Sequence, residues 1–330
     1  MGILCGGRKL LERSFSSPTP PSFKNFKAWE IFLFFSFVRS NIVVDEDALI
    51  CYNLCENIFM RLIMNYSNLH THSIYSDGKH SPREIIEQAI AQNMTAIGIS
   101  DHSYTFFDTR YCLAEEKNKA YIDELRTLKK EYADKIDVLV GIELDGFSLG
   151  YNKADFDYVI GSCHYINFNG DYRSVDSSLD GVVDAINTYC GGDSMMFAKY
   201  YYETYSACLD AMRPDILGHI DLAAKLGVVN EDSPEYRKMA LTALVDSLSH
   251  TKIIEMNTGA ISRGYRKIPY PAPFLLKEIK DRGAKIILSS DSHSKDTLTF
   301  FFDESLELLR ANGINSVLTY KNGSFEEVGI

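Results

Sequence analysis

The sequence predicts an α/β protein in which a parallel β-sheet is covered by helices and closed into a barrel. Short apolar segments with a strand pattern alternate with amphipathic helical segments, roughly seven or eight times from about residue 68 onward. The strand segments are apolar along their length, as in parallel sheets that are buried on both faces. Polar residues gather where these strands end, and barrel enzymes carry their active sites at that edge. This pattern favours a barrel over an open, doubly wound sheet.

Each predicted strand is a short apolar run. The strands are Asn68–His72, Thr95–Ser100, Asp137–Leu144, Tyr158–Cys163, Asp215–Ile220, Ile253–Met256, Lys285–Ser289 and Ser316–Tyr320. The first helix begins after Ser81, because Ser81, Pro82 and Glu84 occupy the N-cap, N1 and N3 positions of a capping box. The later helices are Glu115–Tyr132, 179–189, 195–212, 234–249, Pro273–Asp281 and Glu304–Ala311.

Composition limits the class of protein. The 330 residues are 45% hydrophobic and 24% charged, which suits one large globular domain or two small ones and excludes disordered, collagen-like and coiled-coil chains. The net charge of -11 argues against a nucleic-acid partner, because backbone phosphates attract Lys and Arg. A small anionic substrate, bound by metals or a local cationic pocket, remains compatible with this charge.

Cysteine usage and hydropathy bear on localisation. The seven cysteines are scattered and include no C-x-x-C pair, which is typical of a reducing cytoplasm. The longest mostly apolar run, Ile31–Val38, is far shorter than the roughly 20 residues of a membrane helix. We therefore expect a cytoplasmic protein without a membrane span. Nothing in the sequence indicates its oligomeric state.

Residues 1–63 differ from the rest of the chain. They combine a Ser- and Pro-rich stretch with an aromatic stretch that has neither helical nor strand period. The regular alternation starts just after Met64. We expect a poorly structured extension over 1–63, either a real leader or an artefact of the gene model, and one catalytic barrel over 64–330.

Histidines mark the predicted edge. Seven of the eight lie at the end of a predicted strand or in the loop that follows it: His70, His72, His80, His102, His164, His219 and His293. Glu143 and Asp291 occupy the same relative position on their strands. In a barrel these side chains converge on one face. The H-x-H pair also places both imidazoles on one side of its strand, because side chains alternate with a period of two.

This residue set predicts a metal centre. Imidazoles and carboxylates without clustered thiolates suit Zn, Mn or Fe. The set exceeds the needs of one tetrahedral ion and is sufficient for two or three divalent ions with bridging groups. Centres of this kind activate water and stabilise the charge of phosphoryl transfer. We expect hydrolysis of a small-molecule phosphate monoester.

The order of the motifs resembles that of a known superfamily. The motifs are His70-Thr71-His72, Ser76-Asp77-Gly78, Ser100-Asp101-His102, Gly141-Ile142-Glu143, Gly161-Ser162-Cys163-His164, Gly218-His219-Ile220-Asp221 and Ser290-Asp291-Ser292-His293. They are similar to the motifs of the polymerase-and-histidinol-phosphatase (PHP) superfamily, and most of all to its monofunctional histidinol-phosphatases. The resemblance implies a distorted (β/α)7 TIM-like barrel, a trinuclear metal centre, and hydrolysis of L-histidinol phosphate to L-histidinol and phosphate in histidine biosynthesis.

The resemblance also implies a role for each residue. One ion would be bound by His70, His72, Glu143 and Asp291. A second would share Glu143 and bind His164 and His219, and a third would bind His80, His102 and His293. Asp77 competes with His80 for the third site, because some relatives carry their histidine where this chain has Gly78.

The catalytic residues implied are Glu143, as the bridging ligand, and Asp291 and His293, for proton transfer. A metal-bound hydroxide would attack phosphorus in line. Arg263 is the expected phosphate ligand, since a guanidinium matches phosphate geometry, and Arg266 and Arg173 are weaker candidates.

The leaving group needs its own binding site. The loop after His102 offers Tyr104, Phe106, Phe107 and Asp108 for the imidazole and amine of the substrate, although the same residues could form a hydrophobic lid. Alternative functions share the metal centre: a phosphotyrosine phosphatase, or a nuclease or nucleotide phosphoesterase, of the same superfamily.

Overall fold

The computed structural model describes residues 66–148 and 150–330, which belong to the unit Tyr66–Ile330. The predicted extension, residues 1–63, lies outside the described residues. Within the described part, none of the helices is both long and apolar enough to cross a membrane.

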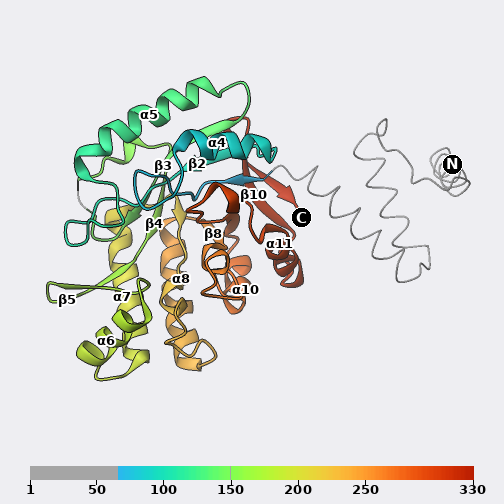
Figure 1. Ribbon diagram of the computed structural model, residues 1–330. Coiled ribbons are helices and arrows are strands. Elements are labelled where there is room, and N and C mark those ends of the chain that lie inside the picture. The colour runs from blue at the N-terminus through green and yellow to red at the C-terminus, as the bar shows by residue number, and fades with distance from the viewer. Residues whose placement is uncertain (1–65, 149) are drawn as a thin grey trace, which may run out of the picture. The chain divides into compact units, whose positions relative to one another are not determined.

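A curled sheet carries the fold (Figure 1). Its strand order is β1-β2-β3-β4-β7-β8-β9-β10-β11, and every neighbouring pair is parallel except the last, β10 with β11. The strands are β1 (Ser67–Asn68), β2 (Ala96–Ile99), β3 (Asp137–Asp145), β4 (Tyr158–Ser162), β7 (Ile216–Leu217), β8 (Ile253–Asn257), β9 (Lys285–Ser289), β10 (Ser316–Lys321) and β11 (Ser324–Gly329).

The sheet closes between its first strand and the segment that follows β9. Thr71 and Ser292 form a parallel bridge there, and the His72 N–H donates to the Ser292 carbonyl at 2.9 Å. The chain therefore forms the distorted TIM-like barrel that the alternation of strands and helices predicted.

Helices lie outside the strands. In Figure 1, α4 and α5 lie along one side of the sheet, and α7, α8 and α10 lie along the other. The helices are α4 (Pro82–Ala91), α5 (Asn118–Glu131), α6 (Leu179–Cys190), α7 (Ser194–Met212), α8 (Pro234–His250), α9 (Gly259–Ser262), α10 (Pro273–Asp281) and α11 (Phe302–Ala311). The predicted capping box is present: the Ser81 hydroxyl accepts from the Glu84 N–H, and the Glu84 carboxylate accepts from the Ser81 N–H.

Tyr158 fills the interior of the barrel. It packs with Leu69, Leu139, Ile216 and other buried residues in one apolar cluster, and its hydroxyl donates to the Leu69 carbonyl, one residue before His70. A side chain at Gly98 or Gly141 would overlap the Tyr158 ring. These two glycines therefore leave room for a large side chain beneath the histidine-bearing edge.

Two strands are shorter than predicted because side chains replace the ladder hydrogen bonds. β1 ends at Asn68, since the Asn68 carboxamide accepts from the His70 N–H at 3.0 Å and the Ser100 hydroxyl accepts from the Thr71 N–H at 3.2 Å. β7 ends at Leu217, and the His219 N–H donates to a Glu255 carboxylate oxygen at 2.7 Å.

The sequence analysis missed two hairpins. β5 (Tyr165–Phe168) pairs with β6 (Asp171–Ser174), and β10 pairs with β11. Both turns are Asn-Gly pairs, Asn169-Gly170 and Asn322-Gly323, with positive φ at all four residues. Asn-Gly between two extended runs is the strongest short-range hairpin signal.

Candidate metal centre

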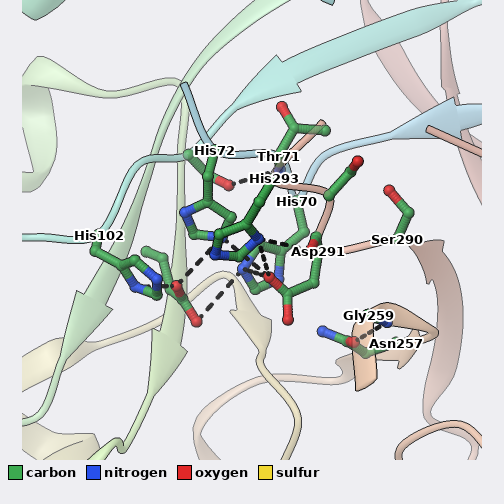
Figure 2. A network of polar contacts seen from close by, with 12 residues as sticks. His70, Thr71, His72, His102, Asn257, Gly259, Ser290, Asp291 and His293 are labelled. Atoms are coloured by element: carbon green, nitrogen blue, oxygen red, sulfur yellow. Dashed lines mark hydrogen bonds and ion pairs between the residues drawn. The ribbon is translucent and has the colours of Figure 1, made fainter. Parts of the chain in front are cut away.

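The predicted ligands converge at the carboxyl ends of the strands. His70 and His72 follow β1, His102 follows β2, Glu143 lies in β3, His164 follows β4, His219 follows β7, and Asp291 and His293 follow β9. Figure 2 shows the imidazoles of His70, His72 and His293 grouped close to the Asp291 carboxylate, with His102 beside them. Nearly all of these residues are buried, and His293 is partly exposed.

Glu143 is the centre of the cluster. Its Oε1 lies 3.4 Å from His70 Nε2, 3.5 Å from His164 Nε2 and 2.9 Å from His219 Nε2. Its Oε2 lies 2.6 Å from His102 Nδ1 and 3.7 Å from His72 Nε2. One carboxylate thus faces imidazoles from four strands or strand ends, which is the geometry that a bridging ligand requires.

Asp291 faces the same space from the opposite side. Its Oδ1 lies 3.1 Å from His72 Nε2 and 3.8 Å from His70 Nε2, and its Oδ2 lies 2.9 Å from Arg263 Nη2. Burial would raise the pKa of Asp291, but the charges of Arg263 and His70 outweigh it and hold this pKa well below its ordinary value. The carboxylate is therefore ionised at neutral pH, as a metal ligand must be.

The electrostatics of the other ligands differ. Burial would lower the pKa of His70, His102 and His164, but acidic neighbours raise it above its ordinary value, so an ion must displace a proton from these rings. Burial, together with the neighbouring His102 and His293, lowers the pKa of His72 to about 3, so its ring is neutral and can bind a cation. Burial alone would raise the pKa of Glu143, but His102, His70 and His164 hold it well below its ordinary value.

Asp77, and not His80, lies in the cluster. Asp77 comes together with His72, His102 and His293 as one of the groups that could hold an ion. The prediction that His80 is a ligand does not fit this geometry, since its Nδ1 accepts from the Lys295 N–H at 3.2 Å. The turn before it is tight: a Cβ at Gly78 would collide with the His72 backbone, so position 78 cannot carry a side chain.

Two buried acids that the sequence analysis missed hold the imidazoles in place. Glu255 in β8 lies 2.8 Å from His70 Nδ1. Asp145, at the end of β3, lies 3.2 Å from His164 Nδ1 and accepts from the His164 N–H at 2.9 Å. Glu255 stands inside an apolar strand, and that anomaly was the available signal for it.

The donor set fits divalent metal ions. Two atoms bound to one zinc at about 2.0–2.1 Å lie about 3.4 Å apart in a tetrahedral site, and the distances between imidazole nitrogens and the oxygens of Glu143 and Asp291 span 2.6 to 3.8 Å. His70 Nε2, both His72 nitrogens and His219 Nδ1 are buried without a hydrogen-bond partner. Buried polar atoms normally have partners, and a metal supplies one for those that face the cluster.

Arg263 lies against Asp291 and His293 at the edge of the cluster. It follows the short helix α9, and its Nη1 donates to the Asp291 carbonyl at 2.7 Å and lies 3.0 Å from His293 Nδ1. The weaker candidates are engaged elsewhere. Arg266 binds both oxygens of Glu231 at 2.9 Å, and Arg173 pairs with Asp171 and Asp184.

The loop after His102 forms an aromatic wall beside the cluster. Tyr111 lies nearest, with its ring centroid 5.0 Å from that of His102 and 6.0 Å from that of Tyr165. Phe107 stacks flat on Tyr172 of the β5–β6 hairpin at 3.9 Å. Of the residues expected to bind the leaving group, Phe107 therefore anchors the hairpin, and Asp108 accepts from the Tyr165 hydroxyl at 3.0 Å.

Comparison with known proteins identifies the family to which this chain belongs. The sequence profile of the PHP domain matches residues 68–259, more than half of the chain. The chain belongs to the PHP domain family. This membership confirms the resemblance drawn from the motif order.

Individual relatives of this PHP protein are similar over most of their length. A protein of Deinococcus radiodurans named "Probable histidinol-phosphatase" is 29% identical over 264 residues, covering 76% of this chain and 94% of the relative. The histidinol-phosphatase of Lactococcus lactis is 26% identical over 277 residues, with coverages of 78% and 95%. The solved structure of the Lactococcus lactis histidinol phosphate phosphatase with Zn, L-histidinol and phosphate shares the fold at a TM-score of 0.59 and 21% identity, covering 79% of this chain and 99% of that one.

Proposed function

We propose that this phosphatase of the PHP family hydrolyses L-histidinol phosphate to L-histidinol and phosphate, with two or three divalent metal ions (Zn, Mn or Fe) in its centre. The observation that carries the proposal is the position of Glu143 between five imidazoles, with Asp291 and Arg263 beside them. Relatives that align over nearly their whole length are named as histidinol-phosphatases, which supports the substrate.

We assign the ligands by the groups that the geometry forms. His70, His72 and Asp291 form one group. Glu143 belongs to two others, one with His70 and His219 and one with His102 and His164. A fourth group is His72, Asp77, His102 and His293. When bound, the ions would activate water and offset the negative charge that develops on the phosphoryl oxygens.

The chain's own side chains would bind the phosphoryl group, move the proton and contact the leaving group. Arg263 stands beside Asp291 with a planar guanidinium that can bind two phosphoryl oxygens at once. His293 Nδ1 lies beside the Asp291 carbonyl and Arg263, and the ring is partly exposed at the rim, where it can move a proton to the departing oxygen whenever its Nε2 holds no ion. The rings of Tyr111 and Tyr165 offer an apolar contact to an imidazole-bearing leaving group, whereas the Asp108 carboxylate is already paired with Arg110.

The decisive experiment measures phosphate release from L-histidinol phosphate by the full chain, with Mn or Zn present and again after chelation. We expect turnover that chelation abolishes and that readded metal restores. Turnover that survives complete metal removal would contradict the metal-dependent mechanism.

The same assay separates the alternatives. Phosphotyrosine peptides and nucleotides are offered at equal concentration, and we expect L-histidinol phosphate to be preferred by about tenfold or more in kcat/KM, the range that pocket contacts supply. A preference for either competitor would identify a different phosphoesterase of the family on the same metal centre.

A further inference from the structure

Glu255 makes three contacts from the interior of the barrel, and it is fully buried in β8. Its Oε2 lies 2.8 Å from His70 Nδ1. Its Oε1 accepts from the His219 backbone N–H at 2.7 Å and from the Asn257 carboxamide at 2.8 Å. The carboxylate thus holds one histidine by its ring and another by its backbone.

The first contact determines which nitrogen of His70 is available. An ionised carboxylate accepts hydrogen bonds and donates none, so the His70 proton on that side must sit on Nδ1. In the neutral ring that a metal ion requires, the other nitrogen, Nε2, carries the free lone pair, and it faces Glu143 Oε1 at 3.4 Å and Asp291 Oδ1 at 3.8 Å. Nε2 is also buried without a hydrogen-bond partner.

The second contact determines where the His219 ring lies. By taking the His219 N–H, Glu255 draws the chain away from the ladder at the end of β7. The ring then points inward, with Nε2 2.9 Å from Glu143 Oε1. His70 and His219 contact the same oxygen of Glu143, and together the three residues form one of the groups that could hold an ion.

We propose that Glu255 is the positioning residue that presents His70 Nε2 and the His219 ring to the metal centre at Glu143. This inference rests on the proposed metal centre, and it adds a carboxylate that touches no substrate and binds no ion. Partners of this kind fix the tautomer and orientation of metal-binding imidazoles, and their loss commonly weakens metal affinity 10- to 100-fold.

Glu255→Gln is the sharpest test because it keeps the shape and changes the hydrogen-bond pattern. All three neighbours of Glu255 donate to it, and a carboxamide can accept at only one of its two atoms. If its oxygen replaces Oε1, its NH2 faces His70 Nδ1 and favours the tautomer with the proton on Nε2. If the carboxamide takes the opposite orientation, its NH2 faces the His219 backbone N–H and the Asn257 NH2, from which it cannot accept a hydrogen bond. Either orientation disturbs one of the two histidines.

The experiment titrates metal-free wild-type and E255Q chains with zinc. Affinity and stoichiometry are measured by calorimetry and elemental analysis, and the ring N–H proton on His70 Nδ1 is followed by NMR in the zinc-loaded protein. We expect at least one zinc equivalent to bind about 10- to 100-fold more weakly in E255Q, the Nδ1 proton signal to be lost or shifted, and phosphatase activity to recover as zinc is raised. Wild-type affinity and an unchanged Nδ1 signal in E255Q would overturn the proposal.

Asp215→Asn is the matched control. It also converts a strand-linking carboxylate to an amide, since Asp215 accepts from the Val159 N–H at 2.9 Å and from Lys153 at 2.7 Å, and it lies at the amino end of β7, away from the cluster. Its zinc affinity should equal that of the wild type; an equal loss in D215N would overturn the specific role of Glu255. If metal-free E255Q does not fold, Glu255→Asp gives the same test. Zinc binding is measured without substrate, so its result can be interpreted even if the protein does not hydrolyse L-histidinol phosphate.

Discussion

Arg263 contacts Asp291 twice, through Nη2 to the Oδ2 carboxylate oxygen at 2.9 Å and through Nη1 to the backbone carbonyl at 2.7 Å. Gly259 makes this contact possible, because a Cβ there would lie 2.7 Å from Asp291 Oδ2 and 2.9 Å from Arg263 Nη2. Asp291 itself has a positive φ of 45°. Asp291 thus has an uncommon backbone conformation, and the arginine that contacts it fits only because Gly259 has no side chain. Such a combination points to a functional position rather than to ordinary packing.

Replacing Arg263 tests its assigned role in phosphate binding. We expect Arg263→Ala to lower kcat/KM about 100-fold, or about 2.7 kcal/mol, because a charge-assisted contact to the phosphoryl group is lost. Arg263→Lys should recover only part of this loss, since an ammonium lacks the planar fork. Steady-state kinetics of both variants, beside exposed Arg310→Ala as control, give the measurement. A kcat/KM in R263A equal to that of the control would remove Arg263 from the phosphate site.

We expect substitutions at Asp77 and at His80 to differ in their effect on the binding of the third ion. Asp77→Asn should lower the metal content by about one equivalent and reduce kcat at least tenfold, because a carboxylate ligand becomes a neutral amide. His80→Asn should leave both nearly unchanged, since its ring accepts from the Lys295 backbone. Elemental analysis of the two purified variants decides between them. Loss of metal in H80N alone would restore the original expectation for His80.

The sequence predicts the position of most of the site, because the ends of the strands in a parallel barrel lie at one edge. Once His164 and His219 are recognised at strand ends, parallel strands must bring them to one edge. The orientation of each imidazole ring could not be predicted, since it depends on Asp145 and Glu255, two acids from neighbouring strands. The same limit applies to Asp77 and His80, because spacing does not show that Asp77 lies in the cluster while His80 accepts from the Lys295 N–H.

The ends of the strands were predictable only in part. The apolar run from Asp215 to Ile220 suggests a longer strand than β7, because a pattern of apolar residues does not show that the Glu255 carboxylate takes the His219 N–H. The two hairpins were predictable, by contrast, since Asn169-Gly170 and Asn322-Gly323 are explicit turn signals in the sequence.

The ion pair between Asp176 and Lys225 gives a prediction for stability against pH. Lys225 donates to Asp176 at 2.7 Å, and both side chains are largely buried. Burial would raise the pKa of Asp176, but Lys225 and His164 lower it overall. A carboxyl whose folded pKa lies below its unfolded value of about 3.9 stabilises the protein above that pH and stops doing so as the pH falls.

Asp176→Asn should therefore reduce the free energy of unfolding by about 2 kcal/mol at pH 7, somewhat less than for a fully buried pair. The difference from the wild type should shrink progressively below about pH 4, as Asp176 becomes protonated in the wild type. Urea unfolding of the two metal-free chains at several pH values measures it. A difference that stays constant from pH 7 to pH 3 would mean that the ionised carboxylate is not the source of the stability.

Metal removal should change stability as well as activity. An ion that binds the folded chain and not the unfolded one stabilises it by about 4 kcal/mol at a thousand times its dissociation constant. The site concentrates Glu143 and Asp291 among imidazoles in a buried space, so a bound ion offsets their charge and chelation removes that contribution. We expect the Tm to fall on chelation and to rise again with Zn or Mn. An identical Tm in both states would contradict metal binding at this site.

Shortening the chain tests the proposed domain boundary. We propose that the barrel is complete from Met64 onward, because its first strand begins at Ser67 and the Ser67 side chain already accepts from the Tyr320 N–H at 2.9 Å, joining the first strand to β10. A chain that starts at Met64 should keep kcat/KM and Tm within about twofold and a few degrees of the full chain, because it keeps every described strand and helix. A chain that starts at Leu69 is the control: it lacks Ser67 and Asn68, whose carboxamide accepts from the His70 N–H, and should lose stability. If the Met64 chain lost activity while the full chain kept it, residues 1–63 would belong to the functional protein.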